Sequence, residues 1–283
     1  MVSVAHAIRW ALGKGRRFFG GWIPKKRIHI YTHHKVATAL TSKVFREISI
    51  YYGLTFKDAP GFHDKVEDSQ VVHYWHSQAS DKILSSEHLG VHFVRDPRDV
   101  IVSGYLFHQR TDEAWCVNDN FEITGDIDFP QVAFSQVHLT HEEKEEYLEW
   151  LNGKSYQENI SSLTQDDGLI FEMDGYAGRT IFCMRDWSTN EQILEVRFEE
   201  ITTNYDEMWM RIFTHLGFEN KELAKAMDIA KKHDMGRMSR DQISQNKHIS
   251  TGKISKWKEY FSENVAREYS KKFNDVHKDI GYD

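Results

Sequence analysis

Apolar and polar positions follow two different periods along this chain. Short apolar runs at residues 28–31, 71–76, 90–94 and 193–198 have the length of buried strands. The longer stretches between them have apolar positions at helical spacing, and they predict helices at Thr38–Tyr52, Pro97–Phe107, Glu142–Leu151, Tyr205–Leu216, Lys221–His233 and Glu263–Ile280. Strands that alternate with helices predict an α/β fold with three layers, a mostly parallel sheet flanked by helices.

The chain is long enough for one large α/β domain. It has 283 residues, only four prolines, and neither an internal repeat nor a low-complexity linker. We therefore expect a single domain over residues 1–283. Residues 1–26 would form an N-terminal arm, and residues 108–192 a mostly helical excursion between two strands of the sheet.

The segment after the first strand has the order strand, loop with lysine, helix. Ile28–Tyr31 is followed by Thr32-His-His-Lys-Val-Ala-Thr38 and then by the predicted helix. Backbone N–H groups and the helix dipole face an anion in such a cradle, and Lys35 adds a positive charge. The loop is not a Walker A motif, because it has no glycine and lacks the GKS/T ending.

A second pair of residues points to the same edge of the sheet. Arg95 closes the apolar run 90–94, and Ser103 follows eight residues later, about two turns into the next helix. The carboxyl ends of parallel strands are where open α/β sheets bind ligands. A guanidinium with a hydroxyl beside it suits a phosphate, although local ion pairs at an Arg-Asp-rich helix start would explain the spacing equally well.

In order along the chain, four motifs resemble those of the sulfotransferases that use 3′-phosphoadenosine-5′-phosphosulfate (PAPS). They are the Lys-Val-Ala-Thr loop at 35–38, the pair Arg95 and Ser103, the late strand with its aromatic-acid-acid ending at 193–201, and the segment Gly-Lys-Ile-Ser-Lys-Trp-Lys at 252–258. Each motif is weak alone, and the ordered set covers residues 28–258.

The resemblance implies a P-loop-like sulfotransferase fold and an enzyme that moves a sulfuryl group from PAPS to a small molecule without a metal. The product nucleotide would be adenosine 3′,5′-bisphosphate (PAP). The nucleotide-binding residues it implies are Lys35, Val36, Ala37, Thr38, Ala39, Leu40, Arg95, Ser103, Ser250, Thr251, Gly252 and Lys253.

The chain departs from the family pattern at several of these positions. Ala37 replaces the usual glycine, Leu40 an aromatic residue, and Ser255 the second glycine of the C-terminal loop. Ser250-Thr251 stands where the family has a basic pair. Arg237 and Arg240 precede that loop and are candidate substitutes for the missing charge.

Sulfuryl transfer needs charge stabilisation and a general base. Lys35 is the candidate for stabilising the leaving phosphate. The resemblance places the base at the end of the strand 71–76, which makes His76 the first choice, and a histidine pKa suits proton removal at neutral pH. His73 is the second choice, and His108 or an acid of the excursion remains an alternative.

Charge is unevenly distributed. Residues 112–174 carry sixteen acids against two lysines, a balance of −14, whereas the whole chain has −7 and the remainder therefore +7. A basic remainder suits a polyanionic nucleotide. An acidic excursion near the acceptor would favour a small cationic acceptor, with Trp115, Phe121 and Phe129 as stacking partners, unless most of its acids lie on solvated helix faces.

Several function classes receive little support. Cys116 and Cys183 form no disulfide framework or zinc pattern, which favours a reducing, cytoplasmic setting. No apolar run is long enough for a membrane span, and no nucleic-acid motif appears. We expect no metal site, because neither His73 with His76 nor His33 with His34 has ligand geometry.

Two other functions share the strand, loop and helix order. One is a P-loop-type small-molecule kinase, against which the missing GKS/T counts. The other is a non-catalytic nucleotide-binding module, which the altered Ser250-Thr251 segment leaves open.

Overall fold

The computed structural model describes residues 21–119, 129, 140–239 and 253–283. Five parallel strands form one sheet in the order β2-β3-β1-β4-β5. They are β1 (Arg27–Tyr31), β2 (Phe56–Ala59), β3 (Val71–Tyr74), β4 (His88–Val94) and β5 (Ile193–Arg197).

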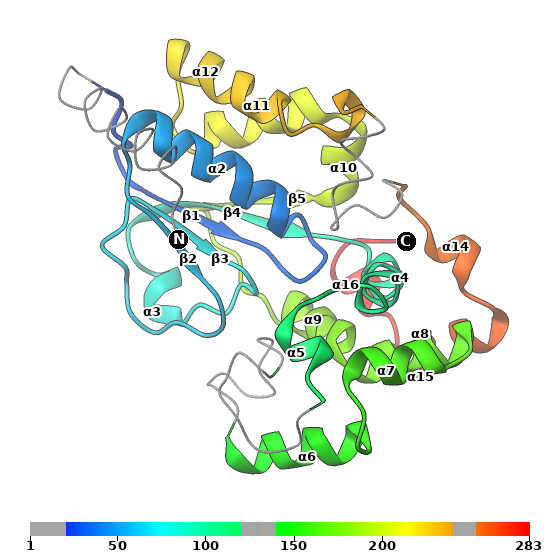
Figure 1. Cartoon of the computed structure of the whole chain (residues 1–283). Helices are drawn as coiled ribbons and strands as arrows, with labels where there is room; N and C mark the ends of the chain where they lie inside the picture. The colour runs from blue at the N-terminus through cyan, green and yellow to red at the C-terminus, as the bar shows by residue number, and fades with distance from the viewer. Residues whose placement is uncertain (1–20, 120–128, 130–139, 240–252) are drawn as a thin grey trace.

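Helices cover both faces of the sheet (Figure 1). On one face lie α2 (Thr38–Tyr52), α10 (Phe198–Thr203), α11 (Tyr205–His215) and α12 (Asn220–Lys231). On the other lie α4 (Pro97–His108) and α9 (Tyr176–Arg185). The other α-helices of the described chain are α3 (Asp81–Leu84), α5 (Ala114–Val117), α6 (His141–Leu151), α7 (Tyr156–Ser162), α8 (Gln165–Asp174), α14 (Trp257–Tyr260), α15 (Glu263–Phe273) and α16 (Val276–Asp279). The prediction of a three-layer α/β fold is confirmed.

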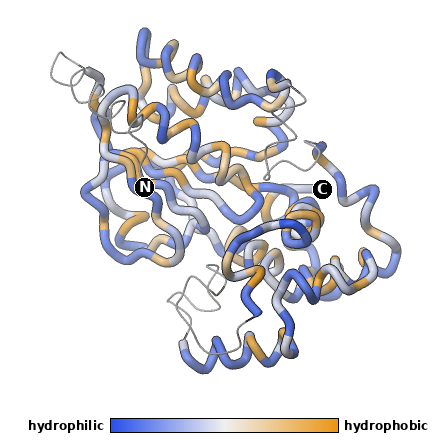
Figure 2. The backbone as a smooth tube through the Cα atoms, viewed as in Figure 1, coloured by the Kyte–Doolittle hydropathy of each residue, from blue (hydrophilic) through white to orange (hydrophobic). Residues whose placement is uncertain are grey.

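The core follows from the alternation of side chains along the strands. Ile28 and Ile30 belong to the same core cluster as Val44 and Phe45 of α2, whereas Tyr31 belongs to a second cluster. Figure 2 shows hydrophobic stretches of backbone in the strands and in the helices that cover them. Both faces of a parallel sheet are buried in this way.

The order of the strands places a switch point between β1 and β4. These two strands are neighbours, and the helices that follow them, α2 and α4, lie on opposite faces of the sheet (Figure 1). Ligands of open α/β sheets bind outside the carboxyl ends of the strands at such a point. The loop after β1 and the residues after β4 are therefore at the favoured edge.

Most predicted elements are present with shifted ends. The strand predicted at 71–76 ends at Tyr74, so that His76 lies beyond it, and β5 ends one residue before the prediction because Phe198 begins α10. The long helix predicted at Glu263–Ile280 is wrong: it divides at Asn274, whose φ of 51° is incompatible with a helix. Strand β2 was not predicted, because Phe56-Lys-Asp-Ala has no strand-like apolar pattern.

The described parts of the excursion 108–192 form five helices, α5 to α9. Across the ranges that the structure describes, no helix combines the length and the apolar character that a membrane crossing requires.

Candidate active site

The loop between β1 and α2 has the backbone geometry of an anion cradle. Lys35 and Ala37 have φ values of 60° and 59°, whereas Val36 between them does not have a positive φ. Alternation of this kind turns successive N–H groups toward one point. Non-glycine residues in the left-handed region cost on the order of 1–3 kcal/mol each, a strain that gathers at ligand sites.

Helix α2 begins without a side chain on its N-terminal N–H groups. Ala37 is the N-cap and has no side-chain oxygen, which leaves the first-turn donors of α2 available to a ligand. The Thr38 hydroxyl donates to Thr32 Oγ1 at 3.0 Å and to the His33 carbonyl at 2.9 Å. Thr38 therefore stabilises the loop from within.

Arg95 joins the ends of three strands. Its Nη1 donates to the Lys35 carbonyl at 2.9 Å, and its guanidinium lies 4.6 Å from the ring centroid of Phe198, the residue after β5. Arg95 is 5 % exposed, and its Nε has no acceptor within the described chain. A buried donor without an acceptor is costly, and it marks a place where a ligand oxygen fits.

The start of α4 binds the C-terminal segment. Asp99 is fully buried and accepts hydrogen bonds from the backbone N–H groups of Ser255 at 2.7 Å and Trp257 at 3.0 Å. Ser103 is almost buried one turn further along α4. The segment 253–257 is thus attached to the helix that carries Ser103.

Four cationic side chains interact electrostatically at this edge: Lys35, Arg95, Arg110 and Lys256. Burial and then Arg95 lower the pKa of Lys35 to about 7, with further lowering by Arg110 and Lys256. Burial, Arg95 and Arg110 lower the pKa of Lys256 to about 8. The Lys35 ammonium lies 3.6 Å from the centre of the Phe107 ring.

Fewer acids offset these cations. Glu113 raises the pKa of Lys35 and so offsets part of the lowering. Asp99 and Glu259 raise the pKa of Lys256 in the same way. Two lysines that hold their protons weakly beside two arginines form a site of excess positive potential. A polyanion would relieve the repulsion between them.

The structure separates the candidate basic residues of the C-terminal part. Lys256 is 4 % exposed and lies in the cation cluster, whereas Arg237 is held at the surface by Asp206 at 2.8 Å and Asp234 at 2.8 Å. Lys253 is exposed, 3.3 Å from Glu259. The predicted residues Ser250, Thr251 and Gly252, and also Arg240, lie outside the described residues.

The two histidines predicted as bases differ in their surroundings. His73 is fully buried, with Nε2 3.2 Å from the hydroxyls of both Thr32 and Thr41 and Nδ1 3.3 Å from Asp58. Burial lowers its pKa, against the effect of Asp58. These three contacts occupy both ring nitrogens, so that His73 ties β3 to the loop and to α2.

His76 has fewer contacts. Its Nε2 lies 3.4 Å from the Tyr176 hydroxyl, and its Nδ1 has no partner within the described chain. The ring is 7 % exposed, and burial followed by His73 lowers its pKa to about 4. His76 is therefore neutral at neutral pH and weakly basic.

A histidine pair that was not predicted lies on the other side of Tyr176. His34 Nε2 is 2.9 Å from His108 Nε2, and His108 Nδ1 is 2.8 Å from Glu172, which is fully buried. The Tyr176 ring packs edge-on against His34 at 4.4 Å and stacks on Trp115 at 4.4 Å. Spacing along the sequence gives no signal for these three residues. His34, His108 and Glu172 come together only because the loop after β1, helix α4 and helix α8 lie side by side in the fold.

The acids of the segment 112–174 lie mainly in solvent. Most of the described ones are exposed, and they are Asp112, Asp119, Glu142, Glu145, Glu146, Glu149, Glu158, Asp167 and Asp174. Glu113 reaches the cation cluster and accepts a hydrogen bond from the Trp115 indole at 2.8 Å. The acidic segment therefore reaches the candidate site through Glu113 and through Glu172, which pairs with His108.

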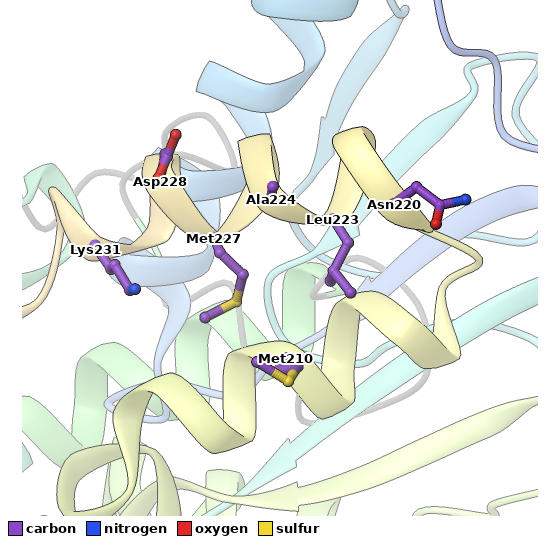
Figure 3. A pocket seen from close by; sticks show the side chains of 7 residues that line it. All are labelled: Met210, Asn220, Leu223, Ala224, Met227, Asp228 and Lys231. Atoms are coloured by element: carbon purple, nitrogen blue, oxygen red, sulfur yellow. The ribbon is translucent and has the colours of Figure 1, made fainter.

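A shallow pocket lies apart from this site. It is lined by side chains of α11 and α12, among them Met210, Leu223 and Met227 (Figure 3). None of its lining residues is among those predicted to bind the nucleotide. No group of three or more His, Cys, Asp or Glu side chains that could hold a metal is present in the described ranges.

Comparisons with known proteins identify the fold. No protein-family model matches the chain, and no curated protein matches it in sequence. Among solved structures, the crystal structure of mouse sulfotransferase SULT7A1 complexed with PAP is similar, with a TM-score of 0.50 and 12 % identity. The match covers 90 % of this chain and 87 % of that chain. The fold is sulfotransferase-like.

Proposed function

We propose that this protein is a sulfotransferase that uses PAPS and releases PAP. The observation that carries the proposal is the cluster of Lys35, Arg95, Arg110 and Lys256 at the carboxyl edge of the sheet. The cluster lies at the edge where open α/β sheets bind ligands, and the fold is similar to that of a sulfotransferase that was crystallised with PAP.

The residues present fit a nucleotide with phosphates at both ends. The N–H groups at the start of α2, residues 37–40, and the Lys35 ammonium would hold the 5′-phosphate, which agrees with the left-handed backbone at Ala37. The Val36 N–H is not part of this set, because it donates to the His33 carbonyl at 2.9 Å. Arg95 and Ser103 would hold the 3′-phosphate, for which the unpaired Nε of Arg95 offers a donor.

Lys256 takes the place of the basic pair that is missing at Ser250-Thr251. It is buried and interacts with Arg95, as a ligand of the same phosphate would. The predicted nucleotide-binding residues Ser250, Thr251 and Gly252 stay predictions, because they lie outside the described residues.

The donor supplies an electrophilic sulfuryl group attached to a good leaving phosphate. Lys35 would stabilise the negative charge that develops on that phosphate oxygen. A general base must take the proton of the acceptor. His76 stays a candidate for that role, because it is neutral at neutral pH, but its pKa of about 4 makes it a weak base.

The acceptor would be a small molecule with a hydroxyl or amino group, and a cationic one in particular. Glu113 supplies a carboxylate beside Trp115, and Trp115 stacks on Tyr176. A carboxylate next to aromatic rings suits an amine or a guanidinium. Trp115 is itself almost buried, which limits the acceptor to a small group.

A screen of acceptors with donor labelled in its sulfuryl group tests this function. Label transferred to any acceptor in excess EDTA supports the proposal. Parallel reactions contain ATP labelled in its γ-phosphate and magnesium. Phosphoryl transfer there would establish a kinase, and nucleotide binding without either transfer would leave a binding module.

A further inference from the structure

A line of three titratable side chains runs from a buried carboxylate to the loop residue that precedes Lys35. Glu172 Oε2 is 2.8 Å from His108 Nδ1, and His108 Nε2 is 2.9 Å from His34 Nε2. The two imidazole rings are stacked, 4.9 Å apart at 11°. Glu172 and His108 are fully buried, whereas His34 is partly exposed.

The contacts assign the protons of both rings. Besides His108, the Glu172 carboxylate accepts hydrogen bonds from the Tyr156 hydroxyl at 2.9 Å and from the Ala177 backbone N–H at 3.1 Å. It acts as an acceptor, so that His108 donates from Nδ1 and its Nε2 carries a lone pair. His34 then donates from Nε2, and its Nδ1 is the nitrogen that carries a lone pair.

His34 lies beside the proposed position of the leaving group. The His34 ring is 5.9 Å from the Phe107 ring, whose face holds the Lys35 ammonium at 3.6 Å. His34 also contacts Tyr176, which stacks on Trp115. It therefore lies between the lysine of the donor site and the aromatic residues of the acceptor side.

Given the proposed sulfuryl transfer, we propose that His34 is its general base, with His108 and Glu172 as positioning residues. The acceptor oxygen forms a bond to sulfur while the bond between sulfur and the phosphate oxygen breaks. His34 Nδ1 takes the acceptor proton, and the leaving phosphate keeps the electron pair, beside Lys35. The Nε2 proton of His34 moves to His108, whose imidazolium is stabilised by Glu172.

A neighbouring histidine provides an internal comparison. His33 belongs to a similar chain of two histidines and a glutamate. Its Nε2 is 2.8 Å from His92 Nε2, and His92 Nδ1 is 3.1 Å from Glu195. However, His33 is 1 % exposed, and burial holds its pKa well below the usual value. It has no route to a substrate and serves to attach the loop to β4 and β5.

The proton affinity of His34 depends on the groups that face it. From α4 these are His108 and, behind it, Glu172 of α8; from α9 it is Tyr176, and from its own loop Lys35. Tyr176 also contacts His76, the residue after the end of β3. In general a neighbouring carboxylate favours a protonated imidazole and a neighbouring cation disfavours it.

Four variants separate this base from the alternatives: His34→Gln, His33→Gln, His76→Ala and Glu172→Gln. Turnover of His34→Gln is expected to fall by on the order of 10²–10⁴-fold, the scale of a lost general base, with PAP affinity in calorimetry unchanged within about twofold. His33→Gln is expected to keep turnover within about tenfold. A loss in His76→Ala as large as that expected for His34→Gln would move the role of base to His76.

The pH profile of kcat gives the readout that a structural role would not move. Wild-type kcat should fall at acidic pH as His34 becomes protonated, and this acidic limb should be absent from His34→Gln. Glu172→Gln should move the limb to lower pH, because removal of the carboxylate makes the imidazole pair less basic. Added imidazole should restore part of the lost turnover to His34→Ala.

A measurement on the free protein does not depend on activity. Histidine ¹⁵N NMR of wild type and of His34→Gln should identify His34 as protonated on Nε2 and His108 as protonated on Nδ1. The opposite tautomer of His34 would overturn the assignment.

The outcomes also separate this inference from the proposed function. If wild type transfers sulfuryl groups and His34→Gln keeps its rate and its acidic limb, His34 is not the base. If His76→Ala alone loses the limb, the base is His76. If wild type binds PAP and transfers nothing to any acceptor, the proposed function fails before the question of the base arises.

Discussion

Arg95 donates a hydrogen bond from Nη1 to the backbone carbonyl of Lys35 at 2.9 Å. This contact joins the end of β4 to the loop after β1, across the point where the strand order changes direction. The two residues that the sequence motifs single out are thus in direct contact. The proposed nucleotide site depends on this pair.

Affinity for PAP is predicted to fall as pH rises. In the free protein the pKa of Lys35 is lowered to about 7 and that of Lys256 to about 8, and a bound phosphate raises both pKa values by favouring the charged forms. Below the pKa values of the free protein, both ammonium charges contribute fully to PAP affinity. This contribution is lost as pH rises from the pKa values of the free protein to the higher pKa values of the complex.

Calorimetry from about pH 6 to about pH 9 measures this dependence. Proton uptake on binding, seen as a dependence of the heat on the buffer, should accompany it near pH 8. Lys35→Arg should flatten the part of the curve near pH 7, because arginine stays charged. An affinity independent of pH over this range would contradict the role of both lysines.

Asp99→Ala is predicted to weaken both the fold and PAP binding. The buried Asp99 carboxylate holds the N–H groups of Ser255 and Trp257, and each buried donor left without an acceptor costs about 1–3 kcal/mol. Thermal unfolding should show the loss of stability, and calorimetry a loss of affinity, since Lys256 lies between the two released residues. A destabilised variant with unchanged affinity would show that this segment does not contribute to the site.

Gly104→Ala is predicted to disturb the line from Glu172 to His34. A Cβ atom at Gly104 would lie 2.5 Å from Glu172 Oε1, and Glu172 is fully buried among partners. Overpacking of this kind costs about 1–3 kcal/mol. Unfolding temperature should fall, and the acidic limb of the pH profile should move as in Glu172→Gln. An unchanged profile would mean that the carboxylate is free to shift without effect.

Local pattern was enough to predict the fold class and the carboxyl-edge loop. Runs such as 28–31 and 90–94 are short, apolar and followed by helical spacing, so that a parallel sheet is the simple interpretation. The ends of the elements were harder, because tertiary contacts decide them. Asn274 ends α15 with a positive φ of 51°, which nothing in the apolar pattern indicates.

Only the site residues that come directly after a predicted strand could be predicted from the sequence. Lys35 and Arg95 each come directly after a strand, which is why the sequence singles them out. Lys256, Arg110 and the pair His34 with His108 depend on contacts between segments more than seventy residues apart, such as the 74 residues between the two histidines. The chain has sixteen histidines, and the sequence alone offers no basis for choosing this pair among them.

A cationic acceptor is predicted to be preferred over a neutral or an anionic one of the same size. Glu113 beside Trp115 would attract the positive group. Matched acceptors are compared by kcat/KM at low and at moderate salt, and the preference should shrink as salt screens the charges. Glu113→Gln should remove it, while Glu145→Gln, on the exposed side of α6, should not. A preference for anionic acceptors would refute the prediction.

Calorimetry of PAP binding in EDTA tests the proposed nucleotide site by itself, because the measurement depends on neither the acceptor nor the base. We expect wild type to bind PAP without metal and Arg95→Ala to bind it more weakly by about 2–3 kcal/mol, the scale of charge-assisted hydrogen bonds to a phosphate. Arg237→Ala, which removes a surface arginine paired with Asp206, should bind like wild type. Absence of binding by wild type, or equal binding by wild type and Arg95→Ala, would contradict the nucleotide site described above.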